Sequence, residues 1–450
     1  MWVMCAEEPL DSATILEAIR IDSTKENFEL ASSITEESLL SMCSNLLVID
    51  SASGTWKVSH LSVAEYFEQN HWSMQKAHLH AVKSCLLLLL EVFASDEHVV
   101  RYSQAGKGVF LEYAMKRWPE HARIQEEEDQ ADYQSMIPLV KRFLGHINEG
   151  SAYFQRYVSC FLDDDDEGPP DIAITPLLIV CIYGLYYTLG DWWECIEISH
   201  WQGYTGIESP LTLAAISNSV PLCRKLVQRG EVVNTQDTGR YGSALAAAAA
   251  EGNLEIVKFL CLEAGADVNL LLKSFCGSAL AAAAFQDNLE IVKFLYLEAG
   301  ADVNLLLNGG YGSALAAAAY DDNLEIVKVL LDAGANVDLL LNGRYGSALA
   351  TAACYGNLDI VKFLCLEAGA DVNLLLKSSF GSALAAAAYN ARLEIVKFLL
   401  DAGANMDLPF ENGRYGLFDI AEYHDYLEAV LGESDPDRHH GIMTHKPCPR

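Results

Sequence analysis

Apolar and polar positions in the second half of the chain recur with a period of 34 or 35 residues. The run Gly-Ser-Ala-Leu followed by four small residues is the clearest marker of this period. Its serine stands at Ser243, Ser278, Ser313, Ser347 and Ser382, in steps of 35, 35, 34 and 35 residues. A fixed period of this length indicates an array of supersecondary units that bury their apolar faces against one another.

Each unit contains the pattern of two helices and an extended loop. The alanine-rich run predicts a first helix, capped by the serine hydroxyl. Apolar residues at helical spacing predict a second helix whose buried face carries Leu324, Val327 and Leu331. Gly334 predicts a left-handed C-cap, and residues 336–345 predict an extended finger with a hairpin turn at its tip.

These units resemble the ankyrin repeat. Ser209-Pro210-Leu211-Thr212 is close to the Thr-Pro-Leu-His that begins that repeat, and Gly252–Lys258 and Gly265–Asn269 match its second helix and the following turn. The resemblance implies a mostly α fold, in which an ankyrin-repeat solenoid of about seven repeats and a partial cap spans residues 171–432.

Residues 1–170 lack this period. Residues 1–72 carry helical spacing at Ile15–Ile19 and Glu36–Cys43, two β-type runs around a turn, and a further helical run at Val63–Glu68. This order predicts a winged-helix-like segment. Residues 73–170 predict a helical connector that ends in the acidic linker Asp163–Pro170, and residues 433–450 predict a disordered tail.

Two segments of this first part resemble fungal NACHT–ankyrin proteins, which are NOD-like, signal-transducing NTPases. The first combines residues of Trp2–Leu10 with Val58–Tyr66, the second is Leu111–His121, and the resemblance covers about the first 160 residues. It implies the sensor or adaptor arm of a NOD-like signalling protein. No G-x-x-x-x-G-K-[ST] phosphate loop occurs in the 450 residues, so we expect no enzymatic activity and no cofactor. The alternative is a fragment of a NACHT NTPase that acts only with a missing nucleotide-binding domain.

The net charge and the arrangement of cysteines limit the kinds of binding partner and the cellular location that we expect. A net charge of −32 repels phosphate backbones, so we expect no nucleic-acid partner. Twelve cysteines without a CxxC pair, and no metal-ligand spacing, indicate free thiols in the cytoplasm and no metal site. The uncharged run 172–189 leaves a membrane-tethered ankyrin scaffold as an alternative, but Gly184 divides it at a repeat turn, so we expect no membrane contact.

Two sets of positions differ between copies: the end of the first helix and the tip of the finger. In ankyrin proteins both places face the concave groove where protein partners dock. Aromatic residues and arginine are also the usual anchors of protein interfaces. We therefore expect a protein partner to contact Phe285, Tyr320, Tyr355, Tyr389, Arg240, Tyr241, Phe275, Tyr311, Arg344, Tyr345, Phe380 and Arg414. The alternative is that the finger aromatics form an internal ladder.

The fingers also carry leucine triplets where ankyrin fingers are mostly polar. These are Leu270–Leu272, Leu305–Leu307, Leu339–Leu341 and Leu374–Leu376. Alternation along an extended chain directs the middle leucine opposite to the other two, so we expect at least one leucine per unit to face water. Such a strip can serve intramolecular contact or self-association, or it can be buried between fingers.

Overall fold

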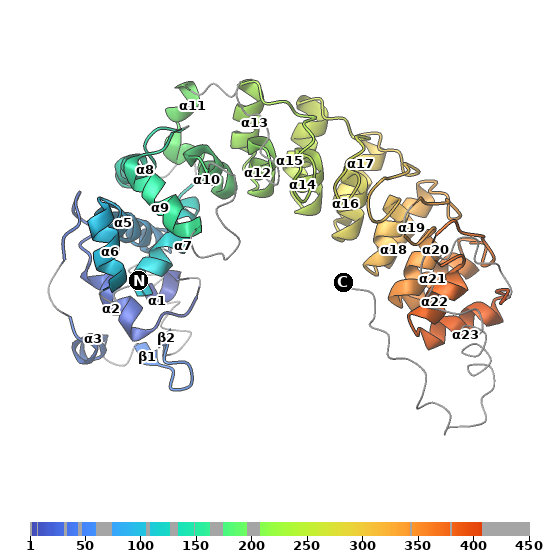
Figure 1. The fold of residues 1–450 in the computed structure, drawn as a ribbon, viewed down its shortest axis with the longest axis horizontal. Helices are drawn as coiled ribbons and strands as arrows, with labels where there is room; N and C mark the ends of the chain where they lie inside the picture. Colours follow the sequence, from blue (N-terminus) through green and yellow to red (C-terminus); the bar gives the residue numbers. More distant parts are fainter. Residues whose placement is uncertain are drawn as a thin grey trace. The chain divides into compact units, whose positions relative to one another are not determined.

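The computed structural model is mostly helical and divides into two compact units, residues 1–198 and 199–450, which we describe separately (Figure 1). The structure describes residues 2–6, 8–30, 34–43, 47–59, 74–104, 109–126, 134–147, 149–162, 174–195, 208–342, 344–378 and 380–406.

The first unit is built around two packed helices, α5 (Met74–Val92) and α7 (Val109–Arg123). The leucine run at positions 86–90 of α5 is buried, which explains its uniform hydrophobicity. The remaining elements are α1 (Trp2–Cys5), α2 (Ser12–Arg20), α3 (Glu36–Cys43), β1 (Leu47–Ile49), β2 (Trp56–Val58), α6 (Asp96–Gln104), α8 (Ile137–Leu144), α9 (Ala152–Leu162), α10 (Pro176–Tyr183), η2 (Tyr187–Leu189) and α11 (Trp192–Cys195).

The expected hairpin is present as the antiparallel pair β1 and β2, in which Val48 lies opposite Lys57. The helix expected at Val63–Glu68 lies outside the described residues, as do the acidic linker and the tail. Two short strands beside α2 and α3 do not by themselves define a winged helix, so that assignment stays a prediction.

Helix α10 covers the middle of the uncharged run 172–189. It is eight residues long and ends at Gly184, which adopts a left-handed conformation with φ 67°. Across the described part of the chain, no helix combines the length and the hydrophobicity needed to cross a bilayer. Helix α10 packs with α7 and belongs to the first unit.

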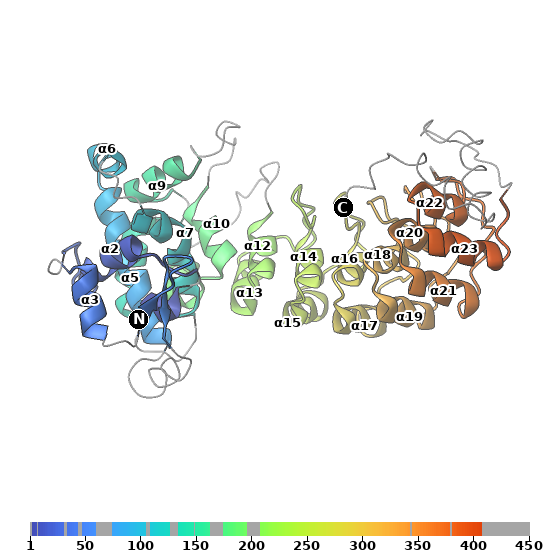
Figure 2. The ribbon, with the colours of Figure 1, turned by 90° about the horizontal axis from the view of Figure 1, so that it is seen from below.

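The second unit stacks helix pairs in two rows, and Figure 2 shows the first helices of the pairs in one row and the second helices in the other. The first helices are α12 (Pro210–Ile216), α14 (Ala244–Ala250), α16 (Ala279–Phe285), α18 (Ala314–Tyr320), α20 (Ala348–Tyr355) and α22 (Ala383–Tyr389). The second helices are α13 (Val220–Gln228), α15 (Leu254–Lys258, continued by the π-helical turn η3, Phe259–Glu263), α17 (Leu289–Leu297), α19 (Leu324–Asp332), α21 (Leu358–Leu366) and α23 (Leu393–Asp401).

The recurring serine caps each first helix, as the sequence predicts. In α18 the Ser313 hydroxyl accepts a hydrogen bond from the Ala316 amide at 3.1 Å, and the other four units repeat this bond. The alanines that follow are almost completely buried between neighbouring first helices. Small side chains thus let consecutive units approach closely, and the octet sets the spacing of the array.

Asparagine side chains join each unit to the one before it. The Asn288 side-chain amide donates to the carbonyl oxygens of Ala249 and Ala250 at 2.9 and 2.8 Å. These carbonyls end the preceding first helix and have no acceptor role within it. Asn253, Asn323 and Asn357 make the same bridge, whereas Arg392 stands at this position in the last pair.

The prediction of which residues form the buried face of the second helix is wrong for two of the three residues. In α19 the buried residues are Ile326, Val327 and Leu330, whereas Leu324 and Leu331 are half-buried. Two apolar stripes that share Val327 fit the helical period in this sequence, and spacing alone cannot choose between them.

The turn between the two helices of a pair needs a left-handed residue, and the last pair supplies it with alanine, at a steric cost. Gly252 and Gly356 fill this position with φ 78° and 93°, whereas Ala391 adopts φ 53°. Replacing Ala391 with glycine is expected to raise the free energy of unfolding by about 1 kcal/mol, because glycine removes the steric strain. Urea unfolding measures the change, and Gly356→Ala is the matched control that should shift stability in the opposite direction.

Candidate interaction surface

The candidate surface consists of the finger tips and the last residues of the first helices, which we call the groove face. Each finger is closed by a backbone bond; for example, the Leu307 amide donates to the Gly312 carbonyl at 2.9 Å. Gly312 has φ 82°, and a Cβ there would lie 2.8 Å from Cβ of Leu341 in the next finger. Glycine therefore permits one finger to pack on the next, and this packing fixes the positions of the tips.

Each leucine triplet divides between the core and the solvent. The third leucines are buried, with 2 to 3% of their surface exposed, because they pack under the neighbouring finger. The middle leucines, Leu271, Leu306, Leu340 and Leu375, are 40, 43, 45 and 39% exposed. One leucine per unit thus faces water, as alternation along the strand predicts.

Eight of the predicted site residues form a continuous series of ring contacts, the aromatic ladder. Within it, Tyr311 contacts Phe285 and Tyr320 with ring centroids 5.0 and 5.2 Å apart. Tyr320 lies 4.0 Å from Tyr355, and Phe380 lies 5.5 Å from Tyr389. The ladder consists of Phe275, Phe285, Tyr311, Tyr320, Tyr345, Tyr355, Phe380 and Tyr389.

The two sets of ladder residues differ in burial. The finger residues Tyr311, Tyr345 and Phe380 are buried, with 1, 6 and 6% of their surface exposed. The first-helix residues are half-buried and keep part of each ring accessible; they are Phe285, Tyr320, Tyr355 and Tyr389. The buried rings fix the geometry, and the half-buried rings present aromatic surface to solvent.

Phe275 is the most exposed member of the ladder, at 56%. Its ring lies over Gly310 of the next finger, where a Cβ would overlap it, and it contacts the Tyr311 ring at 4.6 Å. The Gly310 amide also donates to the Phe275 carbonyl at 3.0 Å. A glycine in one unit thus holds an exposed aromatic ring of the unit before it.

The hydroxyls of Tyr241 and Tyr345 pair with residues ten positions later, a spacing that the sequence analysis missed, whereas the buried Tyr311 hydroxyl does not make this bond. The Tyr241 hydroxyl donates to Glu251, and the Tyr345 and Tyr355 hydroxyls lie 2.5 Å apart. Burial raises the pKa of Tyr241 to about 12 and also raises the pKa of Tyr355. These phenols therefore remain neutral at physiological pH and act through hydrogen bonding.

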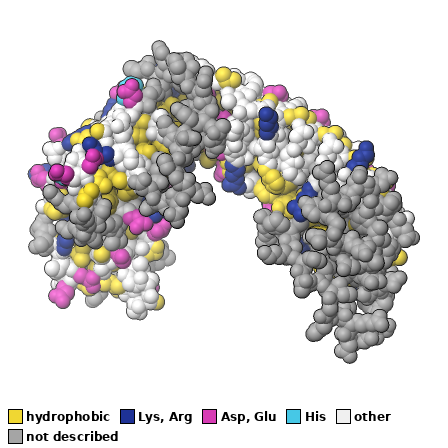
Figure 3. Space-filling view, in the orientation of Figure 1, with side chains coloured by type: hydrophobic (Ala, Val, Ile, Leu, Met, Phe, Trp, Pro, Cys, Tyr) yellow, Lys and Arg dark blue, Asp and Glu magenta, His cyan; other side chains and the backbone are white. Residues whose placement is uncertain are grey.

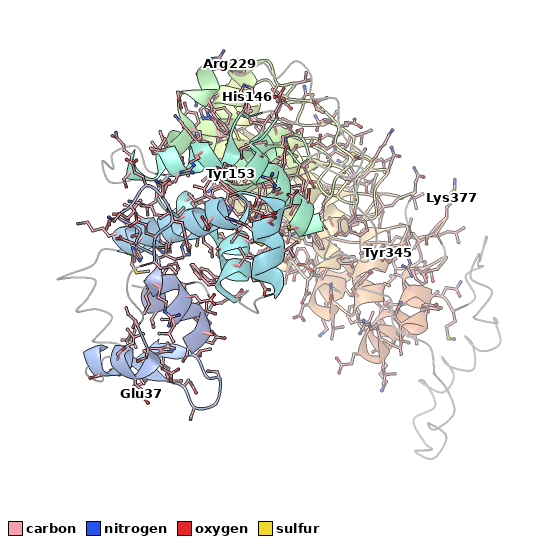
Figure 4. All side chains as sticks on the ribbon, turned by 60° about the vertical axis from the view of Figure 1, so that its left-hand side comes forward. Glu37, His146, Tyr153, Arg229, Tyr345 and Lys377 are labelled. Carbon is pink, nitrogen blue, oxygen red and sulfur yellow. The ribbon has the colours of Figure 1, made fainter. Side chains whose placement is uncertain are left out.

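Cations line the finger tips beside the ladder. The Arg240 and Arg344 guanidinium groups lie 5.3 and 5.9 Å from the rings of Tyr241 and Tyr345. Lys273 and Lys377 each follow the leucine triplet of their own finger, and both are exposed. Figure 4 shows Lys377 directed away from the ribbon. Apolar side chains lie next to Lys and Arg on the face of the repeats in Figure 3. Arg414 lies outside the described residues.

Comparison with known proteins agrees with this architecture. A family model of three ankyrin repeats matches residues 194–271 and 279–375, and a single-repeat model matches residues 382–409. The chain is 44% identical over 66 residues to "Ankyrin repeat and SAM domain-containing protein 6" of Rattus norvegicus. That match covers 15% of this chain and 7% of the relative. The chain therefore contains ankyrin repeats, and its repeat region is a protein–protein interaction module.

Proposed function

We propose that the groove face binds a protein partner and that this recognition, without catalysis, is the function of the repeat unit. The supporting observation is the aromatic ladder, in which buried rings hold half-buried rings and the exposed Phe275 in fixed positions. Rigid aromatic groups bind with little loss of side-chain entropy, which is why they dominate interface energetics. The adjacent finger cations favour carboxylates on the partner.

We further propose that the chain acts as the sensor or adaptor arm of a NOD-like signalling protein. This part rests on the resemblance of the first 160 residues to fungal NACHT–ankyrin proteins. A cytoplasmic location fits the free state of the cysteines that the structure describes. In this arrangement the repeats recognise a ligand protein, and the NTPase that responds is supplied by another polypeptide or segment.

The test is affinity capture with the full chain as bait, comparing the unmodified protein with the triple variant Phe275→Ala, Phe285→Ala and Tyr320→Ala. Truncating two or three interface aromatics typically costs several kcal/mol, on the order of 2 kcal/mol or more for each anchor. We expect at least one specifically captured protein to be lost from the variant.

The control variant changes the exposed leucine to serine at Leu340 and Leu375, which lie in the fingers but outside the ladder. It should retain the captured protein. Thermal unfolding establishes that both variants are folded. An unchanged set of captured proteins for the folded ladder variant would contradict the assignment of the groove face.

A further inference from the structure

The turns that close the second helices differ by one residue, and this difference explains why one repeat step is 34 residues and the others are 35. In α19 and α23 the chain closes with ordinary helical bonds, such as Ala333 amide to Val329 carbonyl at 3.0 Å. In three other units one extra residue is absorbed as a π-type turn. There the amides of Ala264, Ala299 and Ala368 donate to the carbonyls of Phe259, Phe294 and Phe363 at 3.0 to 3.1 Å. Such turns are frequent at functional sites.

The units with the longer closing turn present a leucine to solvent at the end of the second helix. Leu262, Leu297 and Leu366 are 62, 67 and 69% exposed. Each lies seven residues after an exposed acidic residue and four after a lysine, so it continues the outward stripe of its helix. In α19 and α23, whose closing turns are one residue shorter, the same position is aspartate, as Asp332 and Asp401. Aspartate is what solubility alone would favour at this position.

These leucines lie in one row and in an acidic environment. Helices α15, α17, α19, α21 and α23 are consecutive neighbours, so Leu262 and Leu297 lie on adjacent helices and Leu366 lies on the helix beyond Asp332. On its outward face and in its closing turn, each of these five helices carries two carboxylates and one lysine. In α15, α17 and α19 that lysine is paired with a glutamate of its own helix. Arg224 of α13 also pairs with Glu263, so six cations stand against ten carboxylates, and the surface is apolar and negatively charged.

We infer that this row, the leucine stripe of Leu262, Leu297, Asp332 and Leu366, binds a basic amphipathic helix of a partner protein. Packed helices lie about 8–10 Å apart, and seven residues of an α-helix span about 10.5 Å. Residues seven positions apart on one bound helix can therefore each contact one of the consecutive second helices of the array. The bound helix places apolar residues opposite the leucines and a cation opposite Asp332.

The negative charge of the leucine stripe favours a basic helix over two other occupants, a second copy of the chain and an anionic lipid surface. A second copy of the chain would bring another net charge of −32 against an acidic surface. Anionic lipid headgroups are repelled for the same reason. A helix with one apolar and one Lys-rich face satisfies both properties of the stripe.

The test measures binding of a labelled 21-residue helical peptide of leucine and lysine, with leucine on one face, to the full-length protein by fluorescence anisotropy. A scrambled peptide of the same composition controls for attraction of any cation to an acidic protein. We expect the amphipathic peptide to bind about tenfold or more tightly than the scrambled one.

The matched variant is Leu262→Asp, Leu297→Asp and Leu366→Asp, which installs the residue that α19 and α23 already carry. It should retain helical content and bind the two peptides within about twofold of each other. An undiminished preference in this variant would overturn the inference. Concentration-dependent dimerisation that the same variant abolishes would also overturn it, because the occupant would then be a second copy. The ladder variant Phe275→Ala, Phe285→Ala and Tyr320→Ala should keep its peptide preference, which separates failure of this site from failure of the groove face.

Discussion

Replacing Ala318 with leucine will lower the free energy of unfolding of the repeat unit by about 3 kcal/mol. Ala318 is fully buried in α18, which packs between α16 and α20. A leucine adds three carbon atoms to an interface in which every unit carries alanine at this position. The neighbouring helices must separate to accommodate them, so contacts along the array are lost. Urea unfolding followed by far-ultraviolet circular dichroism measures the effect.

The adjacent Ala317 provides the control. Its equivalent in α20 is Thr351, which is equally buried and whose hydroxyl donates to the Ser347 carbonyl at 2.8 Å. Ala317→Thr should therefore cost less than about 1 kcal/mol, since the array already accepts this residue in another copy. Equal losses from the two substitutions would mean that the alanine rows do not set the spacing of the units.

Acidification will destabilise the first unit, because it buries a neutral histidine pair. The His78 and His121 Nδ1 atoms lie 2.7 Å apart, and His121 Nε2 lies 2.8 Å from the Tyr113 hydroxyl. Burial, with smaller contributions from His78 and Arg117, lowers the pKa of His121 to about 3, and burial also lowers the pKa of His78. The pair thus stays neutral in the folded protein at physiological pH.

The direction of the pH effect follows from proton binding. An unfolded histidine has a pKa of about 6.5, so below that pH the unfolded chain binds a proton that folded His121 does not. The contribution of His121 is fully present above about pH 6.5 and is lost as pH falls toward its folded value. The loss is on the order of 5 kcal/mol over the whole range. Denaturant unfolding between about pH 7 and pH 5 will show the first part of this fall.

The variant His121→Gln tests this assignment, because glutamine can hydrogen-bond to Tyr113 without titrating. Its stability at neutral pH will be lower, but its decline with acidification will be shallower than that of the unmodified chain. A decline of unchanged steepness would show that other groups govern the acid sensitivity.

The features of the repeat that depend on backbone requirements could be predicted from the sequence. The serine caps and the left-handed Gly334 are imposed by local stereochemistry, so the residue type is diagnostic at each position. The exposure of the middle leucines followed from alternation alone. The family resemblance supplied the pairing of helices and the position of the groove face.

Features that depend on contacts between units could not be predicted in the same way. The burial of Tyr311 and the exposure of Phe275 depend on the glycine beneath the Phe275 ring, which belongs to another finger. The turn after Leu262 depends on how the chain absorbs one extra residue. The sequence contained a signal for it, because Gly265 follows Leu254 by eleven positions whereas Gly334 follows Leu324 by ten, but only the backbone shows that the added residue forms a π-type turn.

The central claim is that the groove face is where a protein partner binds, and a crosslinking group at Phe275 tests it most directly. Benzoylphenylalanine resembles phenylalanine in shape, and residue 275 is exposed at the edge of the ladder. Placed in the full chain in cells and irradiated, it should yield a discrete crosslinked product that disappears when Phe285 and Tyr320 are changed to alanine. The same group at Leu393, an exposed position of α23, should not give that product. A product that survives loss of both ladder residues, or that forms equally from position 393, would contradict the claim.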